Sequence, residues 1–393
     1  MKILILTTSF PLSKSSTSGV FILHLIENLP ESIDMTVLAP CHRTEIKPVA
    51  KSKYKLKCFR YAPKSWQILA HEPGGIPVAL KNNRKLFFVL PFFLISMTIE
   101  CLRLARKVDV IHANWSVNGV IAGICAFLTG TPVITTLRGS DVRRSLYSRV
   151  EKCLLNLCLK LNDKVIAVSE AICKDVKQNH PGCSQHLLTI PNGVGNNFLN
   201  IFPKRDEKKD RSLSFVSIGN LIPQKGISTV LYALKKIAPL DDIKYHIIGD
   251  GPEKQNLISL SLKLGISEQV HFLGSISHDE IPGYLANMDV LILSSWGEGR
   301  PNVILESMAA GIPVIASNID GVRELIKDSE TGLLFDVDNS GQLAKHMELL
   351  KNNPQLRNKL GTAGRQIIFQ NGLTWNKTAM RYVQIYKDVF NLN

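Results

Sequence analysis

The stretch that decides the fold is SSWGEGRPNVILESMAAGIPVIAS, residues 294–317. It opens on the end of an apolar run, passes through a turn with Gly297 and Gly299, enters a helical pattern near Asn302, and ends in a second apolar run, PVIAS. This order is typical of a buried parallel sheet with crossover helices. Glycines let a backbone approach a ligand closely, and a helix N-terminus offers N–H groups to a phosphate. The turn is therefore a candidate binding site.

The same alternation of short apolar runs and longer helical patterns extends through the chain. In the first half the apolar runs are ILILTT (3–8), MTVLAP (35–40), VDVIHA (108–113), PVITTL (132–137) and KVIAVS (164–169). After the polar interval 202–212 they resume with LSFVSIG (213–219), YHIIGDG (245–251), VHFLG (270–274), DVLILSS (289–295) and PVIAS (313–317). The pattern predicts an α/β protein with two Rossmann-like, doubly wound domains that face each other across a cleft. Their expected bounds are 1–201 and 213–375, with 202–212 as the linker.

Composition excludes several classes of protein. With 393 residues, 45% of them apolar, the chain is not disordered and is long enough for two cores. All eight cysteines precede residue 184 without a C-x-x-C pair, which favours reduced thiols, a cytoplasmic location and no zinc site. The first residues read as a strand and not as a signal peptide, so we expect no export.

Charge is divided unevenly along the chain. Residues 1–200 hold 25 Lys/Arg against 12 Asp/Glu, whereas residues 201–393 hold 22 against 21. The two halves therefore meet different partners. A nucleic-acid partner is not expected, because the interleaved aromatics and binding modules of such proteins are absent.

The longest apolar stretch is LFFVLPFFLISMTI, Leu86 to Ile99. Its fourteen residues are too few to span a bilayer, and it contains Pro91. Basic runs, KNNRK and RLARK, bracket it. Two interpretations stay open: a helix packed on the sheet, or a helix that also lies on an anionic membrane leaflet.

Two carboxylates mark the turn. Glu298 lies in the turn itself and Glu306 follows one helical turn inside the next segment, so both can face one ligand. Carboxylates beside a phosphate site suit the binding of sugar hydroxyls. A pair of glutamates at this spacing is weak on its own, but the surrounding pattern G-E-G-x-P-N-x-x-x-E-x-M-A-x-G-x-P-V-I-A-S is highly specific.

That pattern resembles the donor-site signature of retaining GT-B glycosyltransferases of glycosyltransferase family 4. Further family-like stretches follow in order: VSIGNLIPQKG (216–226), YHIIGDGPEKQNL (245–257), VHFLGSISHDEIPGYLANMDVLILSS (270–295), DGVRELIKDSETGLLF (320–335) and LTWNKTAMRYVQIY (373–386). The resemblance covers nearly all of 164–386 closely and 1–163 more loosely. It implies the GT-B fold, with a C-terminal helix (376–393) that packs back on the first domain.

The resemblance also implies the donor site. The donor-binding residues would be Gly19, Gly219, Asn220, Lys225, Gly274, Glu298, Gly299, Arg300, Asn302, Val303 and Glu306, of which Glu298, Lys225 and Arg300 would act in catalysis. Glu298 would contact the transferred sugar and Glu306 the ribose. Asn220 stands where the family usually has an arginine, so we expect Arg300 to supply part of the missing positive charge. A solvent-facing Arg300 is the alternative.

On the acceptor side the resemblance points to His112, Asn114, Arg138 and Asp141. His112 keeps the first histidine of the family's H-x-H segment and Asn114 replaces the second, so His112 is either an acceptor contact or structural. Arg138 replaces a histidine, and its planar fork suits an anionic group. We therefore expect an anionic glycan or a polyprenyl diphosphate-linked sugar as acceptor, with a neutral acceptor beside a solvated basic face as the alternative.

The implied activity is retaining transfer of a hexose from a nucleotide diphosphate sugar, expected to be a UDP-sugar, to an acceptor hydroxyl in the synthesis of capsule, O-antigen or a related polysaccharide. The family's front-face substitution needs no cofactor and no metal. We expect a cytoplasmic protein that can bind the inner face of an anionic cell membrane. The alternative is a catalytically retired nucleotide-sugar-binding or membrane-scaffold protein of the same fold, because Asn220, Asn114 and Arg138 depart from common family choices.

Overall fold

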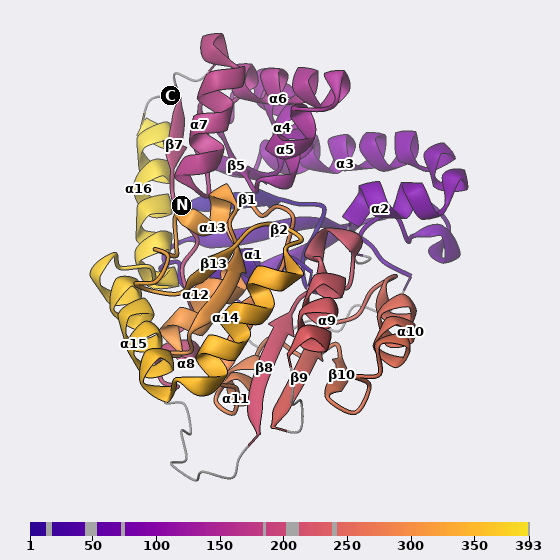
Figure 1. Cartoon of the computed structure of the whole chain (residues 1–393). Helices are drawn as coiled ribbons and strands as arrows, with labels where there is room; N and C mark the ends of the chain where they lie inside the picture. The colour runs from indigo at the N-terminus through magenta and orange to yellow at the C-terminus, as the bar shows by residue number, and fades with distance from the viewer. Residues whose placement is uncertain are drawn as a thin grey trace. The chain divides into compact units, whose positions relative to one another are not determined.

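The chain folds into two compact units. The computed structural model describes residues 1–12, 18–43, 53–71, 75–183, 186–201, 212–237 and 242–391. The first unit comprises Met1–Asn192 and Trp375–Asn393, and the second comprises Gly193–Thr374 (Figure 1). Each unit is built around its own parallel sheet.

The first unit is a doubly wound α/β domain. Within its described residues, the sheet has seven strands in the order β3-β2-β1-β4-β5-β6-β7, and every pair of neighbours is parallel. The strands are β1 (Lys2–Leu6), β2 (Asp34–Pro40), β3 (Tyr54–Phe59), β4 (Val110–Asn114), β5 (Val133–Leu137), β6 (Lys164–Ala167) and β7 (Leu187–Thr189). Strand order reverses between β1 and β4, which is a topological switch point.

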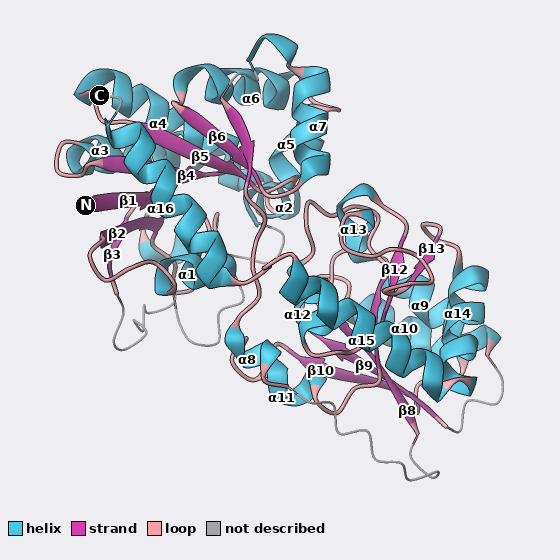
Figure 2. Cartoon of the chain, turned by 90° about the vertical axis from the view of Figure 1, so that its left-hand side faces the viewer, coloured by secondary structure: helices cyan, strands magenta, loops and turns pink. Residues whose placement is uncertain are grey.

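Helices cover both faces of this sheet (Figure 2). They are α1 (Val20–Glu27), η1 (Lys64–Trp66), α2 (Gly75–Asn82), η2 (Arg84–Phe88), α3 (Leu90–Ala105), α4 (Ser116–Thr129), α5 (Ser140–Ser145), α6 (Arg149–Leu161), α7 (Glu170–Asn179), η3 (Pro181–Cys183) and α16 (Trp375–Asn391). Ile3 and Ile5 pack under α1 and α16, whereas Leu4 and Leu6, one position on, pack under α3 and α4. Successive strand residues point to opposite faces, so strands buried on both sides appear in the sequence as continuous apolar runs.

The second unit repeats this architecture. In the part of it that the structure describes, six parallel strands run in the order β10-β9-β8-β11-β12-β13. They are β8 (Leu213–Ile218), β9 (Ile243–Ile248), β10 (Val270–Gly274), β11 (Val290–Leu293), β12 (Val314–Ser317) and β13 (Leu333–Phe335). The switch point lies between β8 and β11, and ligands bind at the carboxyl ends of strands at such points.

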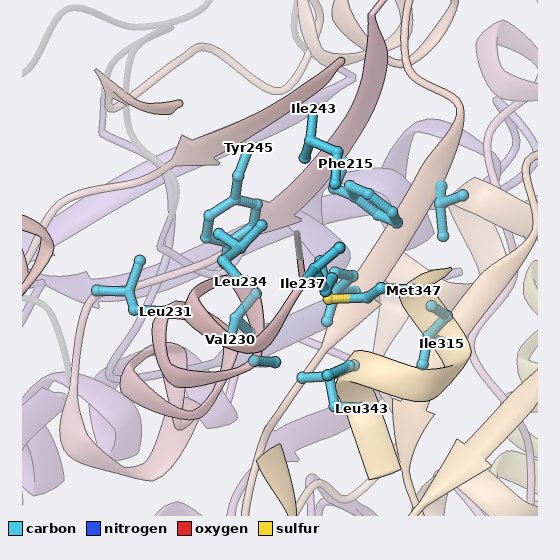
Figure 3. Packing of buried hydrophobic residues seen from close by; sticks show 14 of the residues in the cluster. Phe215, Val230, Leu231, Leu234, Ile237, Ile243, Tyr245, Ile315, Leu343 and Met347 are labelled. Carbon is cyan, nitrogen blue, oxygen red and sulfur yellow. The ribbon is translucent and has the colours of Figure 1, made fainter. Parts of the chain in front are cut away.

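The helices of the second unit again form two layers. They are α8 (Asn196–Leu199), η4 (Pro223–Lys225), α9 (Ile227–Lys236), α10 (Lys254–Leu264), α11 (Ile281–Leu285), α12 (Asn302–Ala309), α13 (Asp320–Arg323), α14 (Ser340–Asn352) and α15 (Pro354–Gln370). One core, shown in Figure 3, packs Phe215 and Tyr245 of the sheet against Val230 and Leu234 of α9 and Met347 of α14. A second core buries α8, α12 and α15 on the opposite face.

The structure divides the chain slightly differently from the sequence-based boundaries. Residues 193–201 belong to the second unit, because Val194 pairs with Thr374 and Phe198 is fully buried in the core of that unit. The expected linker lies outside the described residues except for its last residue. The C-terminal helix begins at Trp375 and packs against α1 of the first unit.

In the described part of the chain, no helix combines the length and the hydropathy needed to cross a membrane.

Candidate active site

Two turns meet at the switch point of the second sheet. One follows β8 and contains Gly219 and Asn220, then the short helix η4 that ends at Lys225. The other follows β11 and contains Glu298, then α12. Both enclose a small pocket lined by 217–221, Lys225, Ile227 and 292–294. Lys225 is the only Lys or Arg among these lining residues, all of which are described.

Lys225 and Glu298 join the two turns. Lys225 Nζ lies 2.6 Å from Glu298 Oε1, and Ser295 Oγ donates to the same oxygen at 2.7 Å. The two side chains are 23% and 15% exposed. Gln224 Nε2 donates to the Gly297 carbonyl at 2.5 Å, and Ser294 Oγ donates to the Lys225 carbonyl at 2.9 Å. These contacts hold a charged pair in place at the rim of the pocket.

Glycines make this close approach sterically feasible. A Cβ on Gly226, which has a φ of +59°, would lie 2.2 Å from the Ser294 carbonyl oxygen. A Cβ on Gly321, at the start of α13, would lie 2.4 Å from the carbonyl oxygen of Glu298 and 2.8 Å from that of Gly299. Since real Cβ atoms do not approach a backbone so closely, neither turn has room for a side chain at these positions.

Glu306 is held by a residue that the sequence analysis did not assign. Its Oε1 lies 2.9 Å from His278 Nε2, and the His278 ring packs edge-on against Phe198 at 5.3 Å between centroids. The Glu306 side chain is 12% exposed. His278 stood inside a family-like stretch, but 28 residues separate it from Glu306, and no local pattern connects the two.

Arg300 does not line the pocket beside Asn220. Its side chain is only 6% exposed, and its NH1 lies 3.4 Å from Glu324 Oε2. Burial lowers the pKa of Arg300, whereas the charge of Glu324 opposes that shift. The solvent-facing alternative is therefore wrong, and the cation expected to replace the missing arginine is paired with Glu324 instead.

The other residues expected at the donor site lie at strand or helix ends of the second unit, apart from Gly19. Gly274 closes β10 with a φ of +72°, and Asn302 and Val303 open α12 after Gly299. Pro301 precedes α12 and no side chain caps it, so its first turn keeps the positive end of the helix dipole. Gly19 belongs to the first unit, where its φ of +71° precedes α1 and a Cβ would clash with Ser9.

In the first unit, Arg138 is held rigidly at the end of β5. Its Nε and NH2 donate to Asn114 Oδ1 at 3.1 and 2.6 Å, and its NH1 donates to Asn192 Oδ1 at 3.1 Å. Its guanidinium lies over the Phe21 ring, 4.4 Å from the centroid. The structure thus brings Arg138 and Asn114, both expected on the acceptor side, into direct contact, and it adds Asn192 and Phe21, which the sequence did not indicate.

His112 is enclosed completely. It is 0% exposed, its Nδ1 lies 2.8 Å from Tyr386 Oη, and its Nε2 lies 2.8 Å from Thr136 Oγ1. Burial, together with the charge of Arg138, lowers the pKa of His112 to about 3. Both ring nitrogens are therefore engaged by the protein, which favours the structural interpretation over an acceptor contact.

Asp141 is also buried, and it binds backbone rather than Arg138. Its carboxylate accepts N–H groups from Ser116 at 3.1 Å, Gly139 at 3.0 Å and Val142 at 3.1 Å. Burial raises the pKa of Asp141, and the charge of Arg144 and these hydrogen bonds oppose the shift. Asp141 thus organises the starts of α4 and α5.

The N-terminus of α4 combines backbone strain with buried polar atoms that lack hydrogen-bond partners. Trp115 has a φ of +69°, which is rare for a residue with a side chain. Asn114 Nδ2, Ser116 Oγ and Asn118 Oδ1 are buried, and within the described residues none has a hydrogen-bond partner. Such strain and unmet polar groups gather at functional sites. Ser116 and Asn118 were not among the predicted residues.

No three His, Cys, Asp or Glu side chains are grouped as metal ligands in the described ranges.

Comparison with known proteins identifies the class. Residues 200–367 match the family "Glycosyl transferases group 1", and residues 18–196 match "Glycosyltransferase Family 4". The two matches fall on the second and the first unit. Each unit therefore matches one glycosyltransferase family along most of its length, and the two matches together support a GT-B glycosyltransferase.

Individual relatives agree with this assignment. The N-acetyl-alpha-D-glucosaminyl L-malate synthase of Bacillus anthracis is 27% identical over 78% of this chain and 82% of its own length. The UDP-Gal:alpha-D-GlcNAc-diphosphoundecaprenol alpha-1,3-galactosyltransferase of Escherichia coli is 31% identical over 60% of this chain and 64% of its own.

Solved structures share the fold. Anabaena HepE in complex with UDP-glucose superposes with a TM-score of 0.78 at 20% identity, covering 99% of this chain and 100% of HepE. Sucrose-phosphate synthase from Thermosynechococcus elongatus gives a TM-score of 0.79 at 19% identity and covers the whole of both chains. The predicted fold class is confirmed.

Proposed function

We propose that this glycosyltransferase transfers a hexose, with retention of the anomeric configuration, from a UDP-sugar to a hydroxyl of an anionic, lipid-linked glycan acceptor. The single observation that supports this most is the Lys225–Glu298 pair at the rim of the pocket. It sets a cation and a sugar-binding carboxylate within one hydrogen bond of each other. Polysaccharide synthesis is the pathway that we infer.

In the donor half, we assign the leaving diphosphate to Lys225 and to the first turn of α12. A cation and a helix N-terminus both stabilise the negative charge that develops as the sugar departs. The neutral Asn220 adds no charge in the same pocket. Glu298 would accept hydrogen bonds from the sugar hydroxyls, and Glu306, oriented by His278, would accept those of the ribose.

The chemical step that we propose is front-face substitution. The bond between the anomeric carbon and the diphosphate oxygen breaks, and a diphosphate oxygen takes the proton of the acceptor hydroxyl. The acceptor oxygen then bonds to the anomeric carbon from the face that the diphosphate leaves. The protein's contribution is alignment and charge stabilisation. In this proposal the reaction needs neither a cofactor nor a metal.

For the acceptor, we assign an anionic group to Arg138. Asn114, Asn192 and Phe21 fix its guanidinium, so little conformational entropy is lost when a phosphate or carboxylate binds. The surplus of positive charge in residues 1–200 favours the same class of acceptor. The E. coli relative, named for a diphosphoundecaprenol-linked acceptor, supports a polyprenyl diphosphate linkage.

The test is a thermal-shift panel of UDP-, GDP-, dTDP- and CMP-sugars without divalent metal, run on the wild type, on Glu306→Ala and on the control Glu348→Ala. A ligand at 100 times its Kd stabilises by about 2.7 kcal/mol. We expect a shift with UDP-sugars in the wild type and in Glu348→Ala, whose glutamate lies exposed on α14, and none in Glu306→Ala.

A measurement of sugar transfer distinguishes an active enzyme from a nucleotide-sugar-binding protein that has lost its catalytic activity. The donor identified by the panel is offered with polyprenyl diphosphate-linked sugars in the presence of EDTA, and the product's anomeric configuration is read by NMR. Binding without transfer to any acceptor would favour the retired protein. An inverted product, or loss of transfer in EDTA, would contradict the proposed mechanism.

A further inference from the structure

Three neighbouring helices of the first unit form one surface layer. α3, α4 and α6 cover the same face of the sheet, and α4 packs against both of the others (Figure 2). We call their solvent side, together with η2, the α3–α4–α6 face. The opposite face of the sheet is covered by α1 and α16.

The middle helix, α4, has an apolar solvent side. Its sequence, SVNGVIAGICAFLT, contains no charged residue. Its exposed residues are Ile124 at 45%, Phe127 at 87% and Leu128 at 59%. Large apolar side chains are unfavourable in water, so a helix whose exposed side chains are all of this kind is expected to pack against a partner.

The flanking helices continue the apolar surface. On α3, Phe92, Ile95 and Ile99 are 63%, 57% and 46% exposed, at a spacing that places them on one stripe. This stripe lies opposite Phe93 and Met97, which fill the core, so α3 is apolar on both sides.

η2 and α6 add to the same surface. Phe87 and Phe88 of η2 are 55% and 80% exposed. On α6 the exposed stripe is Val150, Cys153, Leu157 and Leu161.

The exposed charged side chains of this region are of one sign. Residues 81–162, described throughout, contain twelve Lys/Arg and four Asp/Glu. The exposed charged residues are all basic: Lys81, Arg84, Lys85, Arg103, Arg106, Lys107, Arg143, Arg149, Lys152 and Lys160.

None of the four acids is exposed. Glu100 pairs with Lys57 and Arg103, and Glu151 pairs with Arg144. Asp109 accepts the backbone N–H of Lys2, and Asp141 is buried. The region therefore presents aromatic and aliphatic side chains interleaved with cations.

We propose that the α3–α4–α6 face docks on the surface of a bilayer that contains anionic phospholipids. Such a bilayer offers apolar chains to Phe92 and Phe127 and phosphates to Lys152 and Lys160. A helix at this interface binds both by burial of apolar side chains and by electrostatic attraction to anionic lipids. A second copy of the chain fits less well, because a two-fold contact sets the same patch against itself and brings like charges together. The inference goes beyond sugar transfer and does not depend on it.

The experiment measures partition of the full chain onto vesicles of phosphatidylcholine alone and of phosphatidylcholine with phosphatidylglycerol. Two double variants probe the face: Phe92→Ser with Phe127→Ser, and Lys152→Gln with Lys160→Gln. Two matched controls lie elsewhere: Leu262→Ser with Phe369→Ser, both exposed on the second unit, and Arg381→Gln with Lys387→Gln, exposed on α16. No nucleotide sugar is added, so the result is independent of activity.

We expect binding to the anionic vesicles only, weakened by salt. Because each basic residue near an anionic surface contributes about fivefold, the lysine variant should bind at least tenfold less tightly. The phenylalanine variant should lose a similar factor, and both controls should bind like the wild type. Absence of binding to anionic vesicles overturns the proposal, as does equal loss in the controls. A dimer that the phenylalanine variant dissociates, seen by sedimentation without vesicle binding, would assign the face to self-association instead.

Discussion

Lys225 Nζ and Glu298 Oε1 lie 2.6 Å apart although 73 residues separate them in the chain. Each residue comes from the turn after a strand at the switch point of the second sheet, and each is less than one quarter exposed. The fold thus brings one cation and one carboxylate to the edge of the sheet where ligands bind in this architecture. The position of the pair therefore follows from the topology of the sheet.

Substitution of Lys225 by Ala should lower kcat by about 10²-fold to 10³-fold, because removal of one preorganised charge that stabilises a transition state costs this much. The Tm should fall as well, because Glu298 loses its cation at a site of low exposure, although its hydrogen bond from Ser295 remains. Steady-state kinetics with the donor identified above provide the measurement.

The matched control for Lys225 is Lys55→Ala. Lys55 pairs with Asp34 at 3.2 Å in the first unit, but the two side chains are 75% and 49% exposed. An exposed pair of this kind contributes little to stability or to a distant site. Equal kcat values for Lys225→Ala and the wild type would remove Lys225 from the catalytic step.

His278→Ala should raise the Kd of the nucleotide, because Glu306 loses the partner that orients its carboxylate. Residues in direct contact couple, so the double variant with Glu306→Ala should bind little worse than Glu306→Ala alone. Calorimetric titration of UDP into the four proteins of the cycle measures this coupling. Additive losses from the two substitutions would show that His278 does not act through Glu306.

Much of the fold follows from sequence because parallel strands buried on both faces are apolar throughout. The runs around Ile5, Val37 and Ile111 became strands of the first sheet. β3 was not predicted, because its sequence, YKLKCF, carries lysines as an edge strand does. β7 and β13 were not predicted because they have three residues each. Edge and very short strands bury too little surface to leave a periodic signal.

The sequence connects residues of the candidate site only where they share one turn. Glu298 and Glu306 lie within one strand–turn–helix segment, so their spacing carried information. The partner of Glu306 and that of Arg300 come from other segments, and only the packed structure shows that His278 and Glu324 reach them. The enclosure of His112 likewise depends on Tyr386, 274 residues away.

Gly321→Ala should disrupt the glutamate turn. The new Cβ meets two backbone carbonyl oxygens, of Glu298 and Gly299, that cannot move without shifting the turn itself. We expect a loss of about 1–3 kcal/mol in stability, typical of overpacking, and a Kd for UDP at least several times higher. Chemical denaturation and nucleotide titration measure the two effects.

Gly283→Ala is the control for Gly321→Ala. Gly283 lies in α11, and a Cβ there has no atom within 4 Å. Alanine in place of a helical glycine should leave nucleotide binding unchanged and stabilise by up to about 1 kcal/mol. If both alanines behave alike, close packing at Gly321 does not shape the donor site.

Arg300→Met should lower stability and leave kcat within about twofold of the wild type. The methionine fills similar space but leaves Glu324 without this cation, and loss of a hydrogen-bonded charge partner at a site of low exposure costs about 1–3 kcal/mol. Tm and kcat measured on one preparation separate the two roles. A kcat reduced 100-fold or more at unchanged Tm would restore Arg300 as a source of charge for the leaving diphosphate.

Buried His112 should make the first unit less stable as the pH falls. Its pKa is about 3 in the folded protein and about 6.5 when exposed in the unfolded chain, so between these values only the unfolded state takes up the proton. The contribution of His112 is fully present above pH 6.5 and declines below it by up to about 1.4 kcal/mol per pH unit.

Hydrogen exchange of β4 amides at pH 7.5 and pH 5, converted to free energies of opening, reports on the first unit alone. Because burial also lowers the pKa of His71, to about 4, His112→Gln is compared in a His71→Gln background. We expect the destabilisation caused by His112→Gln to be smaller at pH 5 than at pH 7.5, and an equal value at both would contradict a neutral, buried imidazole.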